Sequence, residues 1–160
     1  MFETIVLWWG LNIKDIIYNQ ICKLTDKENI EDTRFILAIS GGLDSVVLLN
    51  LILQIKRNIY IDLDLFHVNY NMHSKSKIMS DYCLSLAKEN KLNIYLEDYD
   101  SKEFKNTNIE SQARKFRYQK LMDICIKNKI NYVLTAHHED DQIETIYMAE
   151  NNNSSWVSKI

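Results

Sequence analysis

Four short runs rich in β-branched and aromatic residues alternate along the chain with four longer runs of helical periodicity. The β-rich runs cover residues 34–39, 61–67, 93–98 and 132–135, and the helical patterns cover 44–56, 75–90, 109–129 and 140–149. This alternation predicts βαβ crossovers, and hence an α/β fold with an open parallel sheet and helices on both of its faces. Such sheets bind ligands beyond the carboxyl ends of their strands, so the residues that follow each strand are the first candidates for a functional site.

The chain divides into three parts around this alternating region. Residues 1–33 contain an amphipathic helical pattern over 12–24, followed by a polar linker. Residues 34–149 hold all the β-rich runs, and the asparagine-rich residues 150–160 are typical of a flexible tail. Because no further strand is predicted after residue 149, we expect the sheet to lack an edge strand that a longer chain would supply.

The composition is that of one folded globular unit. Of the 160 residues, 46% are hydrophobic and 11% are aromatic, which is enough to bury a core. The net charge of −3 argues against a protein that coats nucleic acid indiscriminately. Residues 101–130 nevertheless hold eight Lys or Arg against three acidic residues, which a solvated helix face and an anionic partner explain equally well.

The cysteines and the apolar N-terminal run indicate in which cellular compartment the protein resides. Cys22, Cys83 and Cys125 are odd in number and form no Cys-x-x-Cys pair, so they indicate neither a disulfide framework nor a zinc or iron–sulfur site. The apolar run at 5–11 has no basic segment before it and charged residues soon after it, which argues against a signal peptide or a membrane span. We therefore expect a cytoplasmic protein with no membrane partner.

A glycine pair follows the first predicted strand, in a chain that has only three glycines. The stretch reads Ser-Gly-Gly-Leu-Asp-Ser at 40–45 and leads into an apolar helical pattern. Glycines at such a turn let backbone N–H groups and the helix N-terminus surround an anion, and the serines add hydroxyl donors. The alternative is an ordinary tight turn with a Ser or Asp helix cap. The sequence contains neither a Walker loop, which ends in Gly-Lys-[Ser/Thr], nor a G-x-G-x-x-G pattern.

The helical pattern over 109–129 carries a second candidate group near its start. Helical geometry places Glu110, Arg114 and Arg117 on one face, where the arginines can bind phosphates through bidentate contacts. Ile109, Ala113 and Phe116 form a separate apolar face. Glu110 also has a structural interpretation, because it stands at the spacing of a helix capping box.

Polar residues also follow the second and fourth predicted strands. His67 and Asn69 stand after the second, where a histidine on its own is more often structural than a ligand. The group after the fourth strand comprises His137, His138, Asp140 and Asp141. One aspartate could simply cap the next helix. Carboxylates beside a phosphate loop are also the expected way to hold Mg²⁺, which bridges nucleotide phosphates.

Four stretches together resemble the N-terminal catalytic domain of the tRNA(Ile)-lysidine synthases. They are residues 40–45, His-Val-Asn at 67–69, the Asn-x-Glu-x-x-Ala-Arg-x-x-Arg-Tyr string at 108–118, and Ala-His-His-x-Asp-Asp-Gln-x-Glu-Thr at 136–145. The first is similar to the pyrophosphate-binding PP-loop of ATP pyrophosphatases, and the last two are the most specific. The resemblance covers residues 34–149 and implies a Rossmann-like PP-loop fold of the adenine nucleotide alpha hydrolase kind.

The resemblance also implies a reaction with ATP and Mg²⁺ as cofactors. ATP would transfer AMP to the C2 carbonyl oxygen of the wobble cytidine of an isoleucine tRNA, and pyrophosphate would leave. The side-chain amine of free L-lysine would then attack that carbon and expel AMP, which forms lysidine. The implied partners are thus tRNA(Ile) with a cytidine wobble base and L-lysine.

The implied roles of the loop and of the carboxylates concern the phosphates of ATP. The residues that would hold the β- and γ-phosphates are Ser40, Gly41, Gly42, Leu43, Asp44 and Ser45. Asp44 and Asp141 would bind Mg²⁺, with Asp140 as the second choice.

The remaining implied roles concern the nucleoside and the tRNA. The residues that would contact the nucleotide are His67, Asn69, His137 and His138, with the segment 66–69 bordering adenine. Arg114, supported by Glu110 and Arg117, would face the adenylated cytidine.

The chain departs from the family pattern in two places. Where the family usually reads His-Val-Asn-His-Gly-Leu-Arg, residues 70–73 are Tyr-Asn-Met-His, so we expect the loss of a glycine turn and of a permanent positive charge. After residue 148 the family usually continues with a further strand and C-terminal tRNA-binding domains. Without them, we expect activity to need those parts from elsewhere, through a homodimer or a separate C-terminal partner.

Two rival interpretations remain. A tRNA thiolase of the same superfamily is the nearest enzymatic rival, but those thiolases use paired cysteines for a cluster, and this chain has none. The other rival is a nucleotide-binding module without catalysis, either a remnant or one half of a complex.

Overall fold

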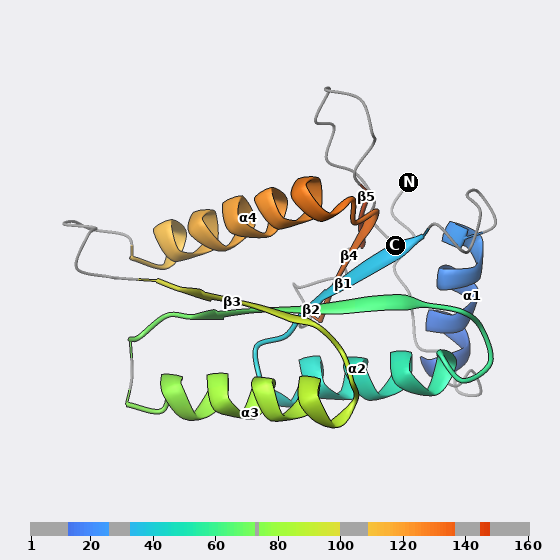
Figure 1. Ribbon diagram of the computed structural model, residues 1–160, viewed down its shortest axis with the longest axis horizontal. Helices are drawn as coiled ribbons and strands as arrows, with labels where there is room; N and C mark the ends of the chain where they lie inside the picture. The colour runs from blue at the N-terminus through green and yellow to red at the C-terminus, as the bar shows by residue number, and fades with distance from the viewer. Residues whose placement is uncertain (1–12, 26–32, 73, 100–108, 137–144, 148–160) are drawn as a thin grey trace.

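The computed structural model describes residues 13–25, 33–72, 74–99, 109–136 and 145–147, with the backbone alone at 25, 110, 111 and 145–147 (Figure 1). The helices and strands of these ranges are α1 (Ile13–Thr25), β1 (Arg34–Ala38), α2 (Leu43–Ile55), β2 (Asp62–Asn69), α3 (Ser76–Glu89), β3 (Ile94–Asp98), α4 (Ile109–Asn128), β4 (Tyr132–Thr135) and β5 (Thr145–Tyr147). No helix of these ranges is both long and apolar enough to cross a membrane.

The strands form one sheet in the order β3-β2-β1-β4-β5. β1 pairs in parallel with β2 and β4, and β2 pairs in parallel with β3. α2 and α3 cover one face of the sheet and α4 covers the other (Figure 1), while α1 packs against α2. The predicted open parallel sheet with helices on both faces is therefore confirmed. Because the strand order reverses at β1, the switch point at which open sheets bind ligands lies between the carboxyl ends of β1 and β4.

The helix predicted over 140–149 is wrong at residues 145–147, which form β5, an antiparallel partner of β4. Thr145 lies opposite Leu134, and Tyr147 lies opposite Tyr132. β-Branched and aromatic residues favour an extended backbone, and pairing satisfies backbone groups at the edge of β4. The expectation that no strand follows residue 149 concerns residues outside the described ranges and stays a prediction. The remainder of 137–149, the polar linker at 26–32 and the expected tail at 150–160 lie outside the described residues.

Alternate residues of the buried strands point to opposite faces of the sheet and pack into two separate cores. Phe35 and Leu37 of β1 pack on the side of α2 and α3, while Ile36 packs on the side of α4 together with Val133 of β4. All four side chains are buried. Strands that are apolar on both faces are expected in a parallel sheet that helices cover on both sides.

α3 and α4 end in the same turn, with a lysine in the left-handed backbone conformation. Lys91 and Lys129 both have φ of 54°. In each case the following residue donates its N–H to the carbonyl five positions earlier, at 2.9 Å. This is the Schellman C-cap, whose left-handed position glycine usually occupies. The two exposed lysines accept a backbone strain of about 1 kcal/mol each.

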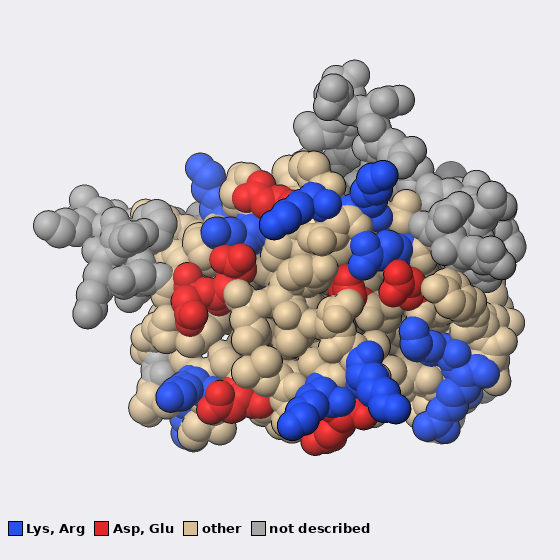
Figure 2. All heavy atoms as spheres, in the orientation of Figure 1, with Lys and Arg blue, Asp and Glu red and all other residues tan. Residues whose placement is uncertain are grey.

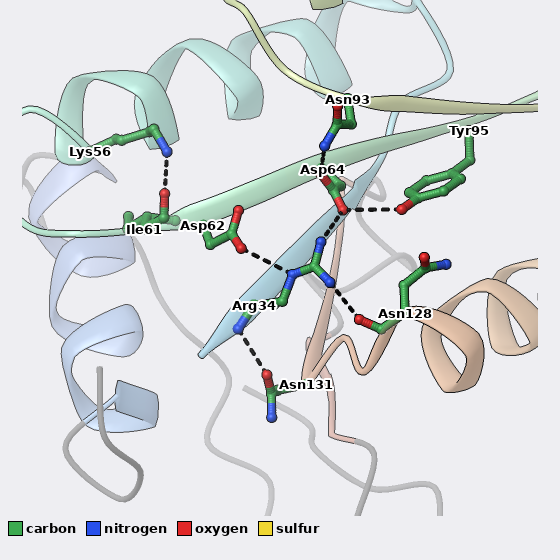
Figure 3. Close-up of polar contacts among 9 residues, drawn as sticks. All are labelled: Arg34, Lys56, Ile61, Asp62, Asp64, Asn93, Tyr95, Asn128 and Asn131. Atoms are coloured by element: carbon green, nitrogen blue, oxygen red, sulfur yellow. Dashed lines mark hydrogen bonds and ion pairs between the residues drawn. The ribbon is translucent and has the colours of Figure 1, made fainter. Parts of the chain in front are cut away.

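Arg34 links three elements at the amino ends of the strands, the edge opposite the switch point (Figure 3). Its Nε donates to Oδ2 of Asp62 at 3.0 Å, and its Nη2 donates to Oδ2 of Asp64 at 2.9 Å. Its Nη1 donates to the carbonyl oxygen of Asn128, the last residue of α4. One guanidinium therefore joins β1, β2 and the end of α4.

The two carboxylates around Arg34 differ in environment. Asp64 is 2% exposed and also accepts hydrogen bonds from Asn93 Nδ2 at 3.1 Å and the Tyr95 hydroxyl at 3.4 Å (Figure 3). The Asp62 side chain is 40% exposed. A buried carboxylate depends on its cation much more than an exposed one does, because water cannot replace the lost partner.

Replacing Arg34 by Met should lower the free energy of unfolding by about 3 kcal/mol or more, because it leaves the Asp64 carboxylate buried without its cation. Asp62→Asn is the matched control, and it should cost less than about 1 kcal/mol because that pair is exposed. Urea denaturation of both variants measures the difference. Equal costs would contradict the buried-charge explanation.

Candidate functional site

A cavity of about 360 Å³ lies at the carboxyl ends of β1, β2 and β4, at the switch point. Its wall includes Ser40 and Ser45 from the turn after β1, Tyr70 after β2, Arg117 of α4 and Thr135 of β4. Residues far apart in sequence thus meet at the edge where the strand-end argument placed a site. A cavity of this volume is within the range that accommodates a small ligand.

The turn from β1 into α2 is built on its two glycines. Gly41 has φ of +82°, which is in the left-handed region, and Gly42 is the helix N-cap with φ of −74° and ψ of 163°. No described side chain caps α2 at Gly42. The Ser or Asp helix cap of the alternative interpretation is therefore wrong, while the binding of an anion by this turn stays a prediction.

The serines of the turn bond to each other and to the backbone. Ser45 Oγ donates to the Gly42 carbonyl at 2.9 Å and accepts the Ser40 N–H at 3.2 Å. Ser40 Oγ lies 3.1 Å from Ser45 Oγ and accepts the Gly42 N–H at 3.2 Å. These contacts hold the turn in one shape at the N-terminus of α2, where the helix dipole favours an anion.

α3 lies too close to Gly41 for any side chain to fit without a shift. A Cβ at this position would lie 3.2 Å from Met79 Cε and 3.3 Å from Cys83 Sγ. A Cβ on Gly42 would instead meet Ser40 Oγ at 3.2 Å. Gly41 is therefore required both for its backbone conformation and for its close contact with α3.

The other two loop residues face outward. Leu43 is 78% exposed, and Asp44 is exposed in the first turn of α2. A carboxylate oxygen beside the loop suits Mg²⁺, which prefers oxygen ligands. Asp140 and Asp141 lie outside the described residues, as do His137 and His138. Within the described part of the chain, no three His, Cys, Asp or Glu side chains gather into a metal-binding group.

His67 borders the cavity, but its ring is held by the protein. Its Nδ1 lies 2.8 Å from the carbonyl oxygen of Ile39 and its Nε2 lies 3.0 Å from Ser80 Oγ. The side chain is 4% exposed, and burial lowers the pKa of His67 below its ordinary value of 6.5. The contacts agree with the structural role that the sequence left open for this histidine.

Asn69 is held in a similar way at the ends of β2 and β3. Its Nδ2 donates to Asn71 Oδ1 at 2.9 Å and to Asp98 Oδ1 at 2.8 Å, and its Oδ1 accepts the Asn71 N–H at 3.2 Å. Asn71 has φ of 52°, a left-handed conformation that asparagine tolerates. The glycine is lost as expected, but a left-handed turn is present here because Asn71 adopts that conformation. The expected loss of positive charge concerns residue 73, which lies outside the described residues.

Arg117 is the cationic side chain that lines the cavity from α4. Its guanidinium carbon lies 5.2 Å from the centre of the Tyr118 ring, and that of Arg114 lies 5.6 Å from the same ring. Burial raises the pKa of Tyr70, while the charge of Arg117 and a hydrogen bond from it oppose the rise. The Tyr118 ring therefore lies beside both predicted arginines, and Arg117 also interacts with Tyr70 at the cavity.

The predicted faces of α4 are only partly confirmed. Ala113 and Phe116 pack into the core on this side of the sheet, but Ile109 is 48% exposed. The side chain of Glu110 is not described. Basic and acidic side chains are interspersed over the face drawn in Figure 2, and Lys120 pairs with Glu97 at 3.2 Å. The positive block at 101–130 thus forms no single-sign patch among the described residues on this face.

Several residues of the cavity were missed from the sequence. They are Tyr70, Ser76, Met79, Thr135 and Ala136. Thr135 ends β4 and Ala136 follows it, directly before the histidine pair, so the strand-end rule could have included them. Nothing in the sequence indicates that Met79 lies against the loop, because that contact depends on how α3 packs.

Comparison with known proteins gives a family and solved structures of similar fold. A family model described as the PP-loop domain matches residues 13–158. A tRNA(Ile)-lysidine synthase from Lactococcus lactis subsp. lactis is 35% identical over 120 residues, which cover 75% of this chain and 27% of that protein. One from Buchnera aphidicola subsp. Acyrthosiphon pisum is 34% identical over 119 residues, which cover 74% and 26%. The chain spans about a quarter of the length of the curated relatives it matches.

Solved structures agree on the fold. The U34-tRNA thiolase of Methanococcus maripaludis, solved with its 4Fe-4S cluster, matches with a TM-score of 0.59 and 17% identity over 78% of this chain and 46% of that chain. The NH₃-dependent NAD synthetase of Campylobacter jejuni matches with a TM-score of 0.61 and 18% identity over 79% and 56%. At these identities the likeness concerns the fold alone.

Gly41→Ala should lower the free energy of unfolding by about 2 kcal/mol. Alanine is strained at a left-handed φ, and its methyl group would also crowd Met79 and Cys83. Gly42→Ala should cost at most about 1 kcal/mol, because its backbone conformation is open to any residue. Chemical denaturation of the two variants gives the comparison. Equal losses would mean that the left-handed turn is not what Gly41 provides.

The free energy of unfolding should fall as the pH drops below about 6.5, because unfolded His67 takes up a proton that the buried folded ring resists. The loss should continue down to the lower pKa of the folded ring. Urea denaturation between pH 8 and pH 5.5 measures it, with His67→Asn as the reference that lacks this group. If both proteins show the same pH dependence, His67 is not its source.

Proposed function

The chain belongs to the PP-loop domain family, and we propose that it binds ATP at the carboxyl edge of its sheet and adenylates a tRNA, as the N-terminal part of a tRNA(Ile)-lysidine synthase. The product would be lysidine, formed at the wobble cytidine of an isoleucine tRNA with L-lysine as the second substrate. The family supports ATP binding, and the relatives' names support the tRNA reaction.

The observation that carries the proposal is the glycine turn beside the cavity. Ser40 and Ser45 lie in the cavity wall, and Gly41 and Gly42 join them at the start of α2. Backbone amides at a helix N-terminus bind phosphate oxygens without the need for a charged side chain. The turn is therefore suited to the pyrophosphate part of ATP.

The proposed reaction has two steps. In the first, the C2 carbonyl oxygen of the cytidine attacks the α-phosphorus of ATP, and the bond to pyrophosphate breaks. In the second, the lysine amine attacks C2 and forms a carbon–nitrogen bond. The bond between C2 and the oxygen of AMP breaks, AMP leaves, and the amine nitrogen gives up a proton. Holding the two reactants in line is the main contribution a protein can make to the first step.

The described residues would divide this work between the two sides of the cavity. The loop amides and the hydroxyls of Ser40 and Ser45 would hold the β- and γ-phosphates. Arg117, held by Tyr70 and Tyr118, would face the negative charge that develops at the adenylated cytidine, with Arg114 beside it. Mg²⁺ would offset the charge of the phosphates, with Asp44 as a ligand and Asp141 or Asp140 as the other.

We propose that the remaining functions of the reaction, such as tRNA recognition and lysine binding, are supplied by other parts of the enzyme. The chain corresponds to about a quarter of its curated relatives, so tRNA recognition, lysine binding and the oligomeric state are assigned here only to the whole enzyme. A homodimer and a separate C-terminal partner both remain compatible with this division. The predicted roles of His137 and His138 at the nucleotide stay predictions.

A nucleotide-binding module without catalysis is the second candidate, because the turn after β1 and the cavity beside it account for phosphate binding alone. A thiolase is less well supported. Cys83 lies in the core on the α2 and α3 side of the sheet, and Cys125 lies in the core on the α4 side. Burial also raises the pKa of Cys83 to about 11 and that of Cys125 to about 12, which disfavours the thiolate that sulfur transfer needs.

Magnesium-dependent exchange between ATP and labelled pyrophosphate, in the presence of an isoleucine tRNA transcript with a cytidine wobble base, tests the proposal. Asp44→Asn should reduce the exchange on the order of 100-fold or more, because it removes a metal ligand. Asp62→Asn, at the opposite edge of the sheet, should leave the exchange unchanged.

Two results would count against parts of the proposal. ATP binding without any exchange, also when a C-terminal tRNA-binding segment of a relative is added, would favour the module. Full exchange by the Asp44→Asn variant would remove Asp44 from the metal site.

A further inference from the structure

The peptide bond between Ile39 and Ser40 is held from both sides. His67 Nδ1 lies 2.8 Å from the carbonyl oxygen of Ile39, and the N–H of Ser40 donates to Ser45 Oγ at 3.2 Å. These two groups belong to one planar peptide unit, so the two contacts together fix its orientation. This peptide is the last one before the chain turns into the glycine loop.

The N–H of Ile39, just after the end of β1, also makes a backbone hydrogen bond to β2. It donates to the carbonyl oxygen of Phe66 at 2.8 Å. The neighbouring residue of β2 is His67, whose side chain then holds the carbonyl of the same Ile39. β2 therefore holds both polar groups of Ile39, one through its backbone and one through an imidazole.

The contacts determine which ring nitrogen of His67 carries the proton. A carbonyl oxygen only accepts hydrogen bonds, so Nδ1 must be the donor to Ile39. Nε2 is then the acceptor in the neutral ring. The Ser80 hydroxyl lies 3.0 Å from Nε2 and 3.3 Å from the Ser76 carbonyl oxygen, and with Nδ1 protonated its one proton goes to the nearer acceptor, Nε2. Through Ser80, which lies on the buried face of α3, the ring connects this helix to the start of the loop.

We propose that His67 is a positioning residue for the phosphate loop: its Nδ1–H fixes the peptide between Ile39 and Ser40 and so sets where the loop amides point. The inference rests on the proposed function, since it assumes that the loop binds the phosphates of ATP. It assigns His67 a supporting contact in place of the contact with adenine that the family resemblance implies. Both ring nitrogens face protein groups, which leaves neither of them directed at a ligand.

Two substitutions separate the roles of the two nitrogens. His67→Asn places an amide nitrogen at the position of Nδ1 and retains the contact with Ile39, whereas His67→Gln places it at the position of Nε2 and retains only the contact with Ser80. We expect His67→Gln to weaken Mg²⁺–ATP binding about tenfold, the effect of one lost buried hydrogen bond, and His67→Asn to weaken it no more than about threefold. Titration of the full chain with Mg²⁺–ATP measures both, and urea denaturation measures the stability of each variant.

A role in stability alone, or a direct contact with ATP, would give different results. If both variants bind ATP as the natural chain does and differ only in stability, His67 is structural and the proposal is overturned. Equal weakening of ATP binding in both variants would also overturn it, because a direct ligand or a requirement for the whole ring would explain that result better.

A second measurement does not depend on ATP binding. The chain has three glycines, so the backbone amide signals of Gly41 and Gly42 are easy to identify in a ¹⁵N spectrum. We expect His67→Gln to shift them and to speed their hydrogen exchange, while His67→Asn leaves both close to those of the natural chain. If the natural chain binds no ATP, the proposed function fails, and these signals still decide whether His67 positions the loop.

The ring itself provides a test that needs no variant. A spectrum of the ring nitrogens in the natural chain should show the neutral tautomer with the proton on Nδ1, with or without Mg²⁺–ATP. A proton on Nε2 instead would overturn the proposal, because Nδ1 could then not donate to Ile39.

Discussion

The contact between α3 and Gly41 is the constraint on which the carboxyl edge of the sheet depends. Met79 and Cys83 come so close to the loop that a Cβ at residue 41 would fit only if they shifted, and the φ of +82° independently favours glycine there. The same face of α3 carries Ser80, which bonds to His67, which in turn bonds to Ile39. One helix face therefore sets the path of the backbone before and within the loop, and the cavity takes its shape from that path.

Much of the architecture and the location of the site could be predicted from the sequence, for a physical reason. Parallel strands end at a common edge, so residues that follow different strands meet whatever the exact course of the helices between them. Ser40, Ser45 and Asn69 were singled out in this way and Arg117 from its place on a helix face, and the cavity includes all four. Only the location follows from this rule, and the contacts of each side chain do not.

The parts that the sequence did not predict depend on packing between distant elements. The segment 145–147 lay inside a helical pattern, but an edge of β4 was available to pair with it, and pairing outweighed the local pattern. The exposure of Ile109 follows from how α4 packs on the sheet, which periodicity cannot show. For the same reason the sequence could not reveal that Asn69 bonds to Asn71 and Asp98.

The left-handed residues described above also show how far the chain can dispense with glycine. Asn71, Lys91 and Lys129 are exposed, and each adopts a left-handed backbone with an ordinary side chain. Codons for asparagine and lysine consist largely of A and T, whereas glycine codons begin with a pair of guanines. Mutational drift toward A and T can therefore remove glycine from turns that face solvent. At Gly41 the left-handed backbone and the neighbouring helix together oppose such a replacement, so this turn, unlike the exposed ones, needs its glycine whatever the base composition of the gene.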